Sequence, residues 1–295
     1  MRESASEPWV LLVDKPAGWT SHDVVAVARG ALAATRIGHA GTLDPFATGL
    51  LVLGVGKATR ILEYLVGLTK VYEARAFLGA ATDTLDPEGE RILEDDNWRN
   101  LGHDRLSGVL AGMTGRLMLT PPRYSAIKVG GVPAHRRVRR GETVELTSRD
   151  VTVHSTELLG VDLPEVRFRV ECSSGTYVRS LAEEYGRRLG TAAHLTALRR
   201  TRVGDFRVDR ASSIESLRAG QVTDRARVSV GESLSQLERV EVNRNEAAML
   251  STGRRIRTEA RNGSPAAFFL PGDELVAIGA VRDGMLEPRK VFRRV

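Results

Sequence analysis

Residues 36–51 read RIGHAGTLDPFATGLL, a glycine-rich loop that leads into an apolar run. The three glycines of this stretch allow the backbone to adopt positive φ angles or to pass close to a ligand. Pro45 biases Asp44 toward an extended conformation. A second interpretation is structural, with Asp44 as the N-cap of a helix and Pro45 in its first position. The spacing alone favours this structural interpretation.

Upstream of this loop, residues 9–13 form a short apolar run that predicts a buried strand. Thr20 or Ser21 can cap the helix that follows, because the apolar residues after them cover one broad face. Downstream, residues 71–78 alternate in polarity with Tyr72 on the apolar face, and they predict a second strand.

The clearest strand pattern is the strict alternation over residues 166–172. Residues 178–189 carry apolar side chains at helical spacing, and Gly190 is a suitable helix stop. Strands and helices alternate without a regular βαβ repeat. The sequence therefore predicts an α+β fold with a mainly antiparallel, mixed sheet.

Two domains are predicted, over residues 1–230 and 238–295. The polar stretch 212–235 shows little periodicity and is interpreted as the junction between them. Beyond it, short strand-like runs are separated by turns at Pro271-Gly272 and Asp283-Gly284, a pattern typical of a small β-rich domain.

The net charge is +6 with a pI of about 9.8, which favours a polyanionic partner. Residues 121–140 contain six basic side chains and no acidic one, so this segment accounts for the whole net charge. Such a cluster is typical of an element that follows nucleic-acid phosphates, although a solvated loop that only aids solubility explains it equally well. The six residues are Arg123, Lys128, Arg136, Arg137, Arg139 and Arg140.

Several other chemistries are not supported. A single cysteine, Cys172, allows no internal disulfide, and the six histidines lack metal-ligand spacing, so no metal site is expected. Residues 54–59 match a Walker A loop incompletely, because Leu51 and Ala58 replace its first glycine and its Ser or Thr. No apolar run is long enough for a membrane helix and no secretory signal is visible, so a cytoplasmic protein is expected.

Five segments, taken together, resemble the TruB family of tRNA pseudouridine-55 synthases. They occur in the family's order at residues 11–25, 36–51, 70–89, 121–131 and 172–200. The resemblance implies a pseudouridine synthase catalytic domain over residues 1–230, with a basic RNA-clasping insertion at about 121–146. It also implies that residues 238–295 form a PUA-like RNA-binding domain, although this part carries no diagnostic motif.

The resemblance further implies the reaction and the partner. A uridine in the T-loop of tRNA would flip out of its stack and be isomerised to pseudouridine. The reaction consumes nothing, so no cofactor and no metal are expected. The T-arm of tRNA is the expected partner, no membrane is involved, and a monomer is expected.

The resemblance also implies roles for individual residues. Asp44 corresponds to the catalytic carboxylate, and Arg179 would pair with it and oppose the rise in its pKa on burial. Tyr72 would stack on the flipped base and take part in proton transfer at C5. His39 would fill the space that the base leaves. The other predicted substrate contacts are Asp86, Tyr177, Leu198, Arg123, Lys128, Arg136 and Arg137.

The resemblance is incomplete at Ser174, where the family often has lysine, so one basic contact with the substrate is in doubt. Leu198, predicted to line the uracil pocket with Tyr177, is explained nearly as well by core packing.

Three alternative functions remain at this stage. The first is a pseudouridine synthase that acts on ribosomal RNA or within a guide-RNA particle, and the second is a non-catalytic RNA-folding module. The third is a glycoside hydrolase, which needs two opposed carboxylates. Asp44 has no acidic neighbour between residues 24 and 62, but partners distant in sequence remain possible.

Overall fold

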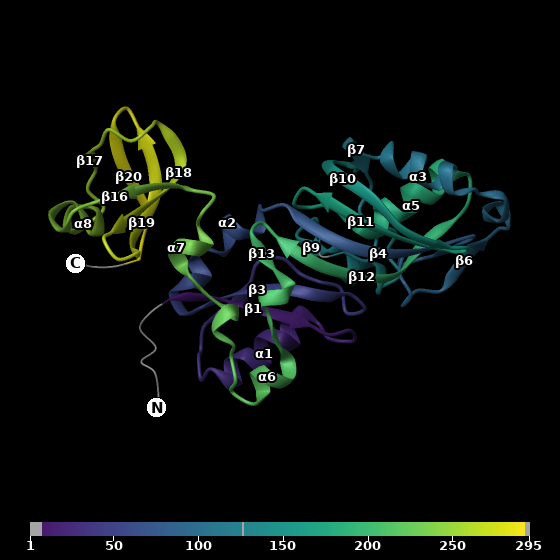
Figure 1. The fold of residues 1–295 in the computed structure, drawn as a ribbon, viewed down its shortest axis with the longest axis horizontal. Helices are drawn as coiled ribbons and strands as arrows, with labels where there is room; N and C mark the ends of the chain where they lie inside the picture. Colours follow the sequence, from purple (N-terminus) through teal and green to yellow (C-terminus); the bar gives the residue numbers. More distant parts are fainter. Residues whose placement is uncertain (1–7, 126, 293–295) are drawn as a thin grey trace.

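The computed structural model describes residues 8–125 and 127–292 (Figure 1). The first residues of the chain, on which the expectation of no secretory signal rests, lie outside these ranges. Among the described residues, no helix combines the length and the apolar character needed to cross a membrane.

A large sheet forms the centre of the molecule, and within the described residues it has eleven strands. They are β1 (Trp9–Lys15), β2 (Ile37–His39), β3 (Thr48–Val55), β4 (Lys70–Leu78), β7 (Gly115–Leu119), β10 (Arg149–Asp162), β11 (Glu165–Cys172), β12 (Ala193–Val203), β13 (Phe206–Arg207), β14 (Ser212–Ser213) and β15 (Arg227–Ser229). The main path runs β14-β1-β3-β12-β4-β11-β10-β7. Its β14–β1 and β3–β12 pairs are parallel and the others antiparallel, which confirms the predicted mixed sheet.

The described residues form eight α-helices, and α1 and α5 lie where the sequence predicts helices. They are α1 (Ser21–Ala31), α2 (Leu62–Val66), α3 (His103–Ala111), α4 (Ala134–Val138), α5 (Val178–Leu189), α6 (Ile214–Arg218), α7 (Val230–Ser233) and α8 (Arg244–Ser251), with short 3-10 turns η1 (Gly56–Arg60), η2 (Asn97–Asn100), η3 (Val208–Arg210) and η4 (Asp224–Ala226). Thr20, rather than Ser21, caps α1, because its side chain accepts a hydrogen bond from the Asp23 amide. Gly190 ends α5 in the left-handed conformation, as predicted.

Two hydrophobic clusters lie along the large sheet. In one cluster, α5 packs on β12 and β4 and α3 packs on β10 and α5, and Tyr72 of β4 and Phe168 of β11 are buried there. In the other, β1 and β3 are buried on both faces, with α1 and α6 packed beside them (Figure 1). The active-site loop between β2 and β3 lies where these two halves of the sheet meet.

The stretch 212–235 is not a domain junction, and that prediction is wrong. β14 and β15 both pair with β1, and Ile214, Leu217 and Val228 are buried in the same cluster as β1. The elements of this stretch are two to five residues long, which is too short for periodicity to reveal them.

A second sheet of five strands follows, as the strand-like runs predict. In the described residues its order is β16-β18-β19-β20-β17, with bounds β16 (Glu238–Glu241), β17 (Ile256–Arg257), β18 (Gly263–Leu270), β19 (Glu274–Arg282) and β20 (Met285–Val291). One face of this sheet has its own core, whereas Phe269, Ile278 and Phe292 belong to the cluster of β1 and β3. The two sheets therefore share buried apolar surface.

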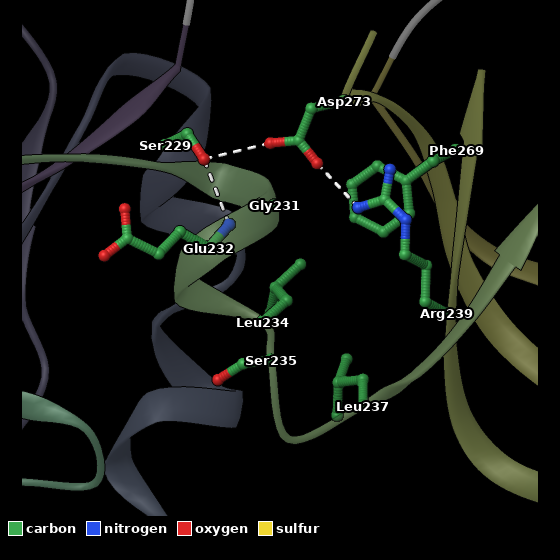
Figure 2. A pocket seen from close by; sticks show the side chains of 9 residues that line it. All are labelled: Ser229, Gly231, Glu232, Leu234, Ser235, Leu237, Arg239, Phe269 and Asp273. Carbon is green, nitrogen blue, oxygen red and sulfur yellow. Dashed lines mark hydrogen bonds and ion pairs between the residues drawn. The ribbon is translucent and has the colours of Figure 1, made fainter. Parts of the chain in front are cut away.

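A polar contact joins the second sheet to α7 (Figure 2). Asp273 accepts hydrogen bonds from the Ser229 hydroxyl at 2.9 Å and from Arg239 at 2.6 Å. The Arg239 guanidinium also stacks over the Phe269 ring, 4.0 Å from its centroid. These residues line the pocket drawn in Figure 2. Since Arg239 and Asp273 are paired with each other, we regard the pocket as a connection between the two sheets rather than as a substrate site.

Two hairpins extend from the large sheet. β5 (Ala80–Thr82) pairs with β6 (Arg91–Glu94) and carries the turn that contains Asp86. β8 (Lys128–Val129) pairs with β9 (Val132–Pro133) and leads into α4. Along the chain, β8, β9 and α4 lie between β7 and β10, and these two strands pair with each other in the sheet.

Candidate active site

Asp44 lies in an irregular loop between β2 and β3. Residues 40–47 include no helix, so the interpretation of Asp44 as a helix N-cap is wrong. The side chain of Ser21, at the start of α1, accepts a hydrogen bond from the Leu43 amide at 2.9 Å. On the other side of Asp44, the Pro45 carbonyl accepts one from the Gly18 amide at 2.9 Å. The residues on both sides of the carboxylate are therefore held by the segment before and at the start of α1.

Arg179 forms the predicted ion pair with Asp44. Its Nε lies 3.0 Å from Asp44 Oδ2, and its side chain is only 3% exposed, against 32% for Asp44. Arg179 is the second residue of α5, where the helix dipole disfavours a cation, and the anionic partner compensates for this. The exposed part of the Asp44 carboxylate remains open to a substrate.

The other Arg179 nitrogens are also bound. Nη1 donates to the Thr84 carbonyl at 2.9 Å and to Asp86 Oδ2 at 3.1 Å, and Nη2 donates to the Tyr124 carbonyl at 3.0 Å. Arg179 thus connects the Asp44 loop, the β5–β6 turn and the start of the basic insertion. These fixed contacts leave the guanidinium little freedom to move away from Asp44.

Asp86 is held in place by hydrogen bonds within the protein. Its side chain is buried, and its oxygens also accept hydrogen bonds from the Thr84 hydroxyl at 2.6 Å and the Glu88 amide at 3.0 Å. The Asp86 carboxylate thus forms a second ion pair with Arg179, in addition to that of Asp44. A contact between Asp86 and a nucleotide remains a prediction.

Burial raises the pKa of Asp44 above the ordinary value for aspartate, and the charge of Arg179 opposes this increase. The charge of Asp86 adds to the increase, while that of Lys15 opposes it. The charges of Arg179 and Lys15 therefore favour the ionised carboxylate against the effect of burial.

Tyr72 and Leu198 form the apolar side of the site. They are buried on neighbouring strands, β4 and β12, in one cluster with Leu43. Burial raises the pKa of Tyr72, so its phenol is neutral at neutral pH. Tyr177 precedes α5 and is half-buried; burial raises its pKa, and the charge of Asp44 adds to the increase. The structure therefore groups Tyr72 and Leu198 in one buried cluster, and the place of Tyr177 in the pocket remains a prediction.

His39 lies on β2, before the loop, and is half-buried. Burial lowers its pKa and favours the neutral ring. Among the described residues, its Nδ1 finds no hydrogen-bond partner. A neutral ring is compatible with stacking, but the predicted role in filling the RNA stack remains a prediction.

The basic insertion places its cations differently from one another. Arg123, Lys128 and Arg136 are exposed, whereas Arg137 is half-buried and its Nε lies 2.5 Å from Glu142. The sequence stretch 121–140 has no acid, so this pairing comes from a residue just beyond it. Arg137 is therefore a weaker candidate for a phosphate contact than its neighbours.

Lys15 belongs to the site but is absent from the predicted residues. Its side chain is fully buried and donates to the carbonyls of Trp19 at 2.6 Å and Pro45 at 3.1 Å. Burial lowers its pKa to about 8, and the charge of Asp44 opposes the decrease. In the sequence Lys15 looks like part of a polar turn after a strand, and no local pattern separates it from a surface lysine.

Two family models match this chain. The N-terminal domain of the TruB family pseudouridylate synthases matches residues 29–178, and the C-terminal domain of tRNA pseudouridylate synthase B matches residues 179–240. The chain belongs to the TruB family. It is accordingly a pseudouridine synthase, an isomerase, and the family predicted from the sequence is confirmed. A glycoside hydrolase is excluded.

Individual relatives agree with this membership. A TruB relative from Thermobifida fusca (strain YX), named tRNA pseudouridine synthase B, is 46% identical over 294 residues, covering 96% of this chain and 98% of that protein. A relative of the same name from Leifsonia xyli subsp. xyli (strain CTCB07) is 45% identical over 280 residues, or 91% of each chain. Among solved structures, a Cbf5-Nop10-Gar1 complex has a chain with TM-score 0.75 and 26% identity, covering 97% of this TruB chain and 85% of that one.

Proposed function

We propose that this enzyme isomerises uridine 55 in the T-loop of tRNA, with Asp44 as the catalytic carboxylate. The observation that carries the proposal is the Asp44–Arg179 ion pair of 3.0 Å. Leu43, the residue before Asp44, is buried in one cluster with Tyr72 and Leu198. The names of the relatives from Thermobifida fusca and Leifsonia xyli support tRNA as the substrate.

The reaction exchanges one bond for another. The bond between ribose C1′ and uracil N1 breaks, the uracil turns, and C1′ bonds to C5. The proton on C5 leaves and N1 gains one, so no atom is gained or lost overall. Ionised Asp44 either attacks the nucleoside or removes a ribose proton, and Arg179 keeps it ionised. Tyr72 stacks on the base and assists the proton transfer at C5.

Base flipping explains the rest of the proposed site. The reacting atoms are inaccessible in stacked RNA, so the uridine turns out of the T-loop into the pocket. His39 takes the place that it leaves. The phosphates of the T-arm bind the insertion through exposed cations such as Arg123, Lys128 and Arg136, with Arg137 contributing less because of Glu142.

The proposed organisation has a catalytic unit over residues 1–230 and a PUA-like RNA-binding unit over 238–295. The second family match ends at residue 240, so the second unit is proposed from its five-stranded sheet rather than from that match. A monomer is the proposed active form, and the cytoplasm is the proposed location because tRNA is found there.

The test uses the purified protein alone and an unmodified tRNA transcript. Carbodiimide-dependent primer-extension stops map pseudouridine, and we expect one new stop at uridine 55. A matched transcript with cytidine at that position should give none. A ribosomal RNA fragment tests the first alternative substrate. No stop in tRNA, or modification only after a guide RNA is added, would overturn the proposal.

A further inference from the structure

Arg200 is a buried arginine next to the site. It lies on β12 and is 1% exposed. Its strand neighbours are Tyr72 on β4 and Gly49 at the start of β3. Burying a guanidinium is costly unless its N–H groups find acceptors, so its partners indicate what the residue does.

Those partners are two backbone carbonyls of the Asp44 loop and one of β3, which follows it. Nε donates to Leu50 at 2.8 Å, Nη2 to Gly41 at 3.1 Å, and Nη1 to Thr42 at a longer 3.4 Å. In the described part of the chain, Arg200 forms no ion pair with a carboxylate, whereas Arg179 binds two. Near Asp44, Arg179 therefore pairs with carboxylates, whereas Arg200 binds backbone carbonyls.

The three carbonyls lie on both sides of Asp44 in the sequence, so one planar group holds both ends of the loop. The backbone is close as well, because a Cβ added to Gly49 would lie 2.3 Å from the Arg200 carbonyl oxygen. Gly49 also has φ near +101°, which other residues rarely adopt. Because the backbones of Gly49 and Arg200 are so close, the end of the loop has little freedom to move relative to Arg200.

Arg200 also acts on the opposite side of the site. Burial raises the pKa of Tyr72, and the charge of Arg200 is the largest effect that opposes the increase. Since Tyr72 is its direct neighbour across the strands, Arg200 both binds the segment that contains Asp44 and lies next to Tyr72 in the sheet.

We propose that Arg200 is a positioning residue. Its three hydrogen bonds to backbone carbonyls hold the Asp44 loop in a fixed position relative to Tyr72. The proposal rests on the proposed roles of Asp44 and Tyr72. Lysine cannot replace it, because a single ammonium group cannot donate in the directions of a planar guanidinium. Substrate binding does not require Arg200, since the side chain is buried beneath the loop.

The test compares Arg200→Lys with Arg199→Lys. Arg199 is the next residue on the same strand, 40% exposed and ion-paired with Asp14, so its substitution is a matched control. Three quantities are measured for each variant: the single-turnover rate of pseudouridine formation with saturating enzyme, the Kd for tRNA, and the Tm. We expect Arg200→Lys to lose at least about 30-fold in rate, or about 2 kcal/mol, with Kd changed less than about threefold. The control should keep the wild-type rate.

Two results would overturn the proposal. One is a single-turnover rate for Arg200→Lys within about threefold of the control. The other is a loss of rate that only follows the unfolded fraction, since Arg200 would then serve the fold alone. Arg200→Gln, which keeps N–H donors without a buried charge, covers the case in which Arg200→Lys fails to fold, and unfolding of both variants also contradicts a positioning role. Wild-type protein that forms no pseudouridine would instead refute the proposed function.

Discussion

The Asp44 loop and the basic insertion are both irregular parts of this protein, yet they are held very differently. Along the loop, the carbonyls of Gly41, Leu43, Pro45 and Leu50 accept hydrogen bonds from buried side chains of other segments. The insertion is fixed mainly at its start, where Arg179 binds the Tyr124 carbonyl, while most of its cations point into solvent.

This difference matches two physical requirements. Bond cleavage needs a carboxylate held to within a fraction of an ångström, which only fixed surroundings provide. Capture of a flexible polyanion needs charge more than geometry, because phosphate contacts are long-range and carry no sequence information. Substitutions in the loop and its supports should therefore change the rate, and substitutions in the insertion should change binding.

The largest effect should come from Asp44→Asn. No other carboxylate occupies its place, so we expect a loss of at least about 10⁴-fold in single-turnover rate, or about 5.5 kcal/mol, with tRNA binding spared. Asparagine has nearly the same shape, which makes the variant a clean test of charge. A variant that binds normally and keeps more than about a tenth of the wild-type rate would refute the catalytic role.

Arg179→Lys should have the next largest effect. Lysine preserves the charge but cannot bind Asp44, Asp86 and two carbonyls at once. We expect about a 100-fold loss in single-turnover rate, roughly 2.7 kcal/mol, measured under saturating enzyme. Retention of the full rate would show that charge alone suffices and that the fixed geometry is unnecessary.

Loss of three exposed insertion arginines should act on binding instead. For the variant with Arg136, Arg139 and Arg140 changed to Ala, we expect the slope of log Kd against log salt to fall by about 2 to 3. Each lost phosphate contact accounts for about 0.7 to 0.9 of this decrease. The rate at saturating enzyme should persist. Removing Arg29, Arg218 and Arg225, which are exposed outside the insertion, gives the same change in net charge as a control. Equal slopes for both variants would mean that the insertion has no special role.

The pH dependence of the rate should report the environment of the loop. Burial raises the pKa of Asp44, so its ionised form is lost at a higher pH than in an ordinary aspartate, whose pKa is about 3.9. As pH falls below the raised pKa, the single-turnover rate should decrease about tenfold per unit. Binding and circular dichroism at each pH separate this effect from dissociation and unfolding. An acid limb at or below the ordinary pKa contradicts the prediction.

Arg137→Ala should have the smallest effect. Its guanidinium is already paired with Glu142, so we expect the salt slope to change by less than about 0.7. The same titration applied to Arg136→Ala gives the comparison with an exposed neighbour. If Arg137 proves the more important of the two, tRNA must displace Glu142 on binding.

Local sequence determined a large part of this protein. The alternation that predicts β4 and β11, the helical spacing of α5 and the glycine after it depend on neighbouring residues, and the structure confirms them. The resemblance of five segments led to the correct family and to the Asp44–Arg179 pair, which the structure brings to 3.0 Å. These features could be read because their periodicity or motif lies within one short stretch of chain.

Only the tertiary structure decided the features that join distant segments. The stretch 212–235 belongs to the large sheet because its short elements pair with β1, a contact that no local period records. Lys15, Arg200 and Glu142 acquired their places in the same way, since a charged residue in sequence looks solvated until the fold buries it or brings a partner to it. Burial and pairing depend on what packs against a side chain, and those neighbours are set by the whole fold.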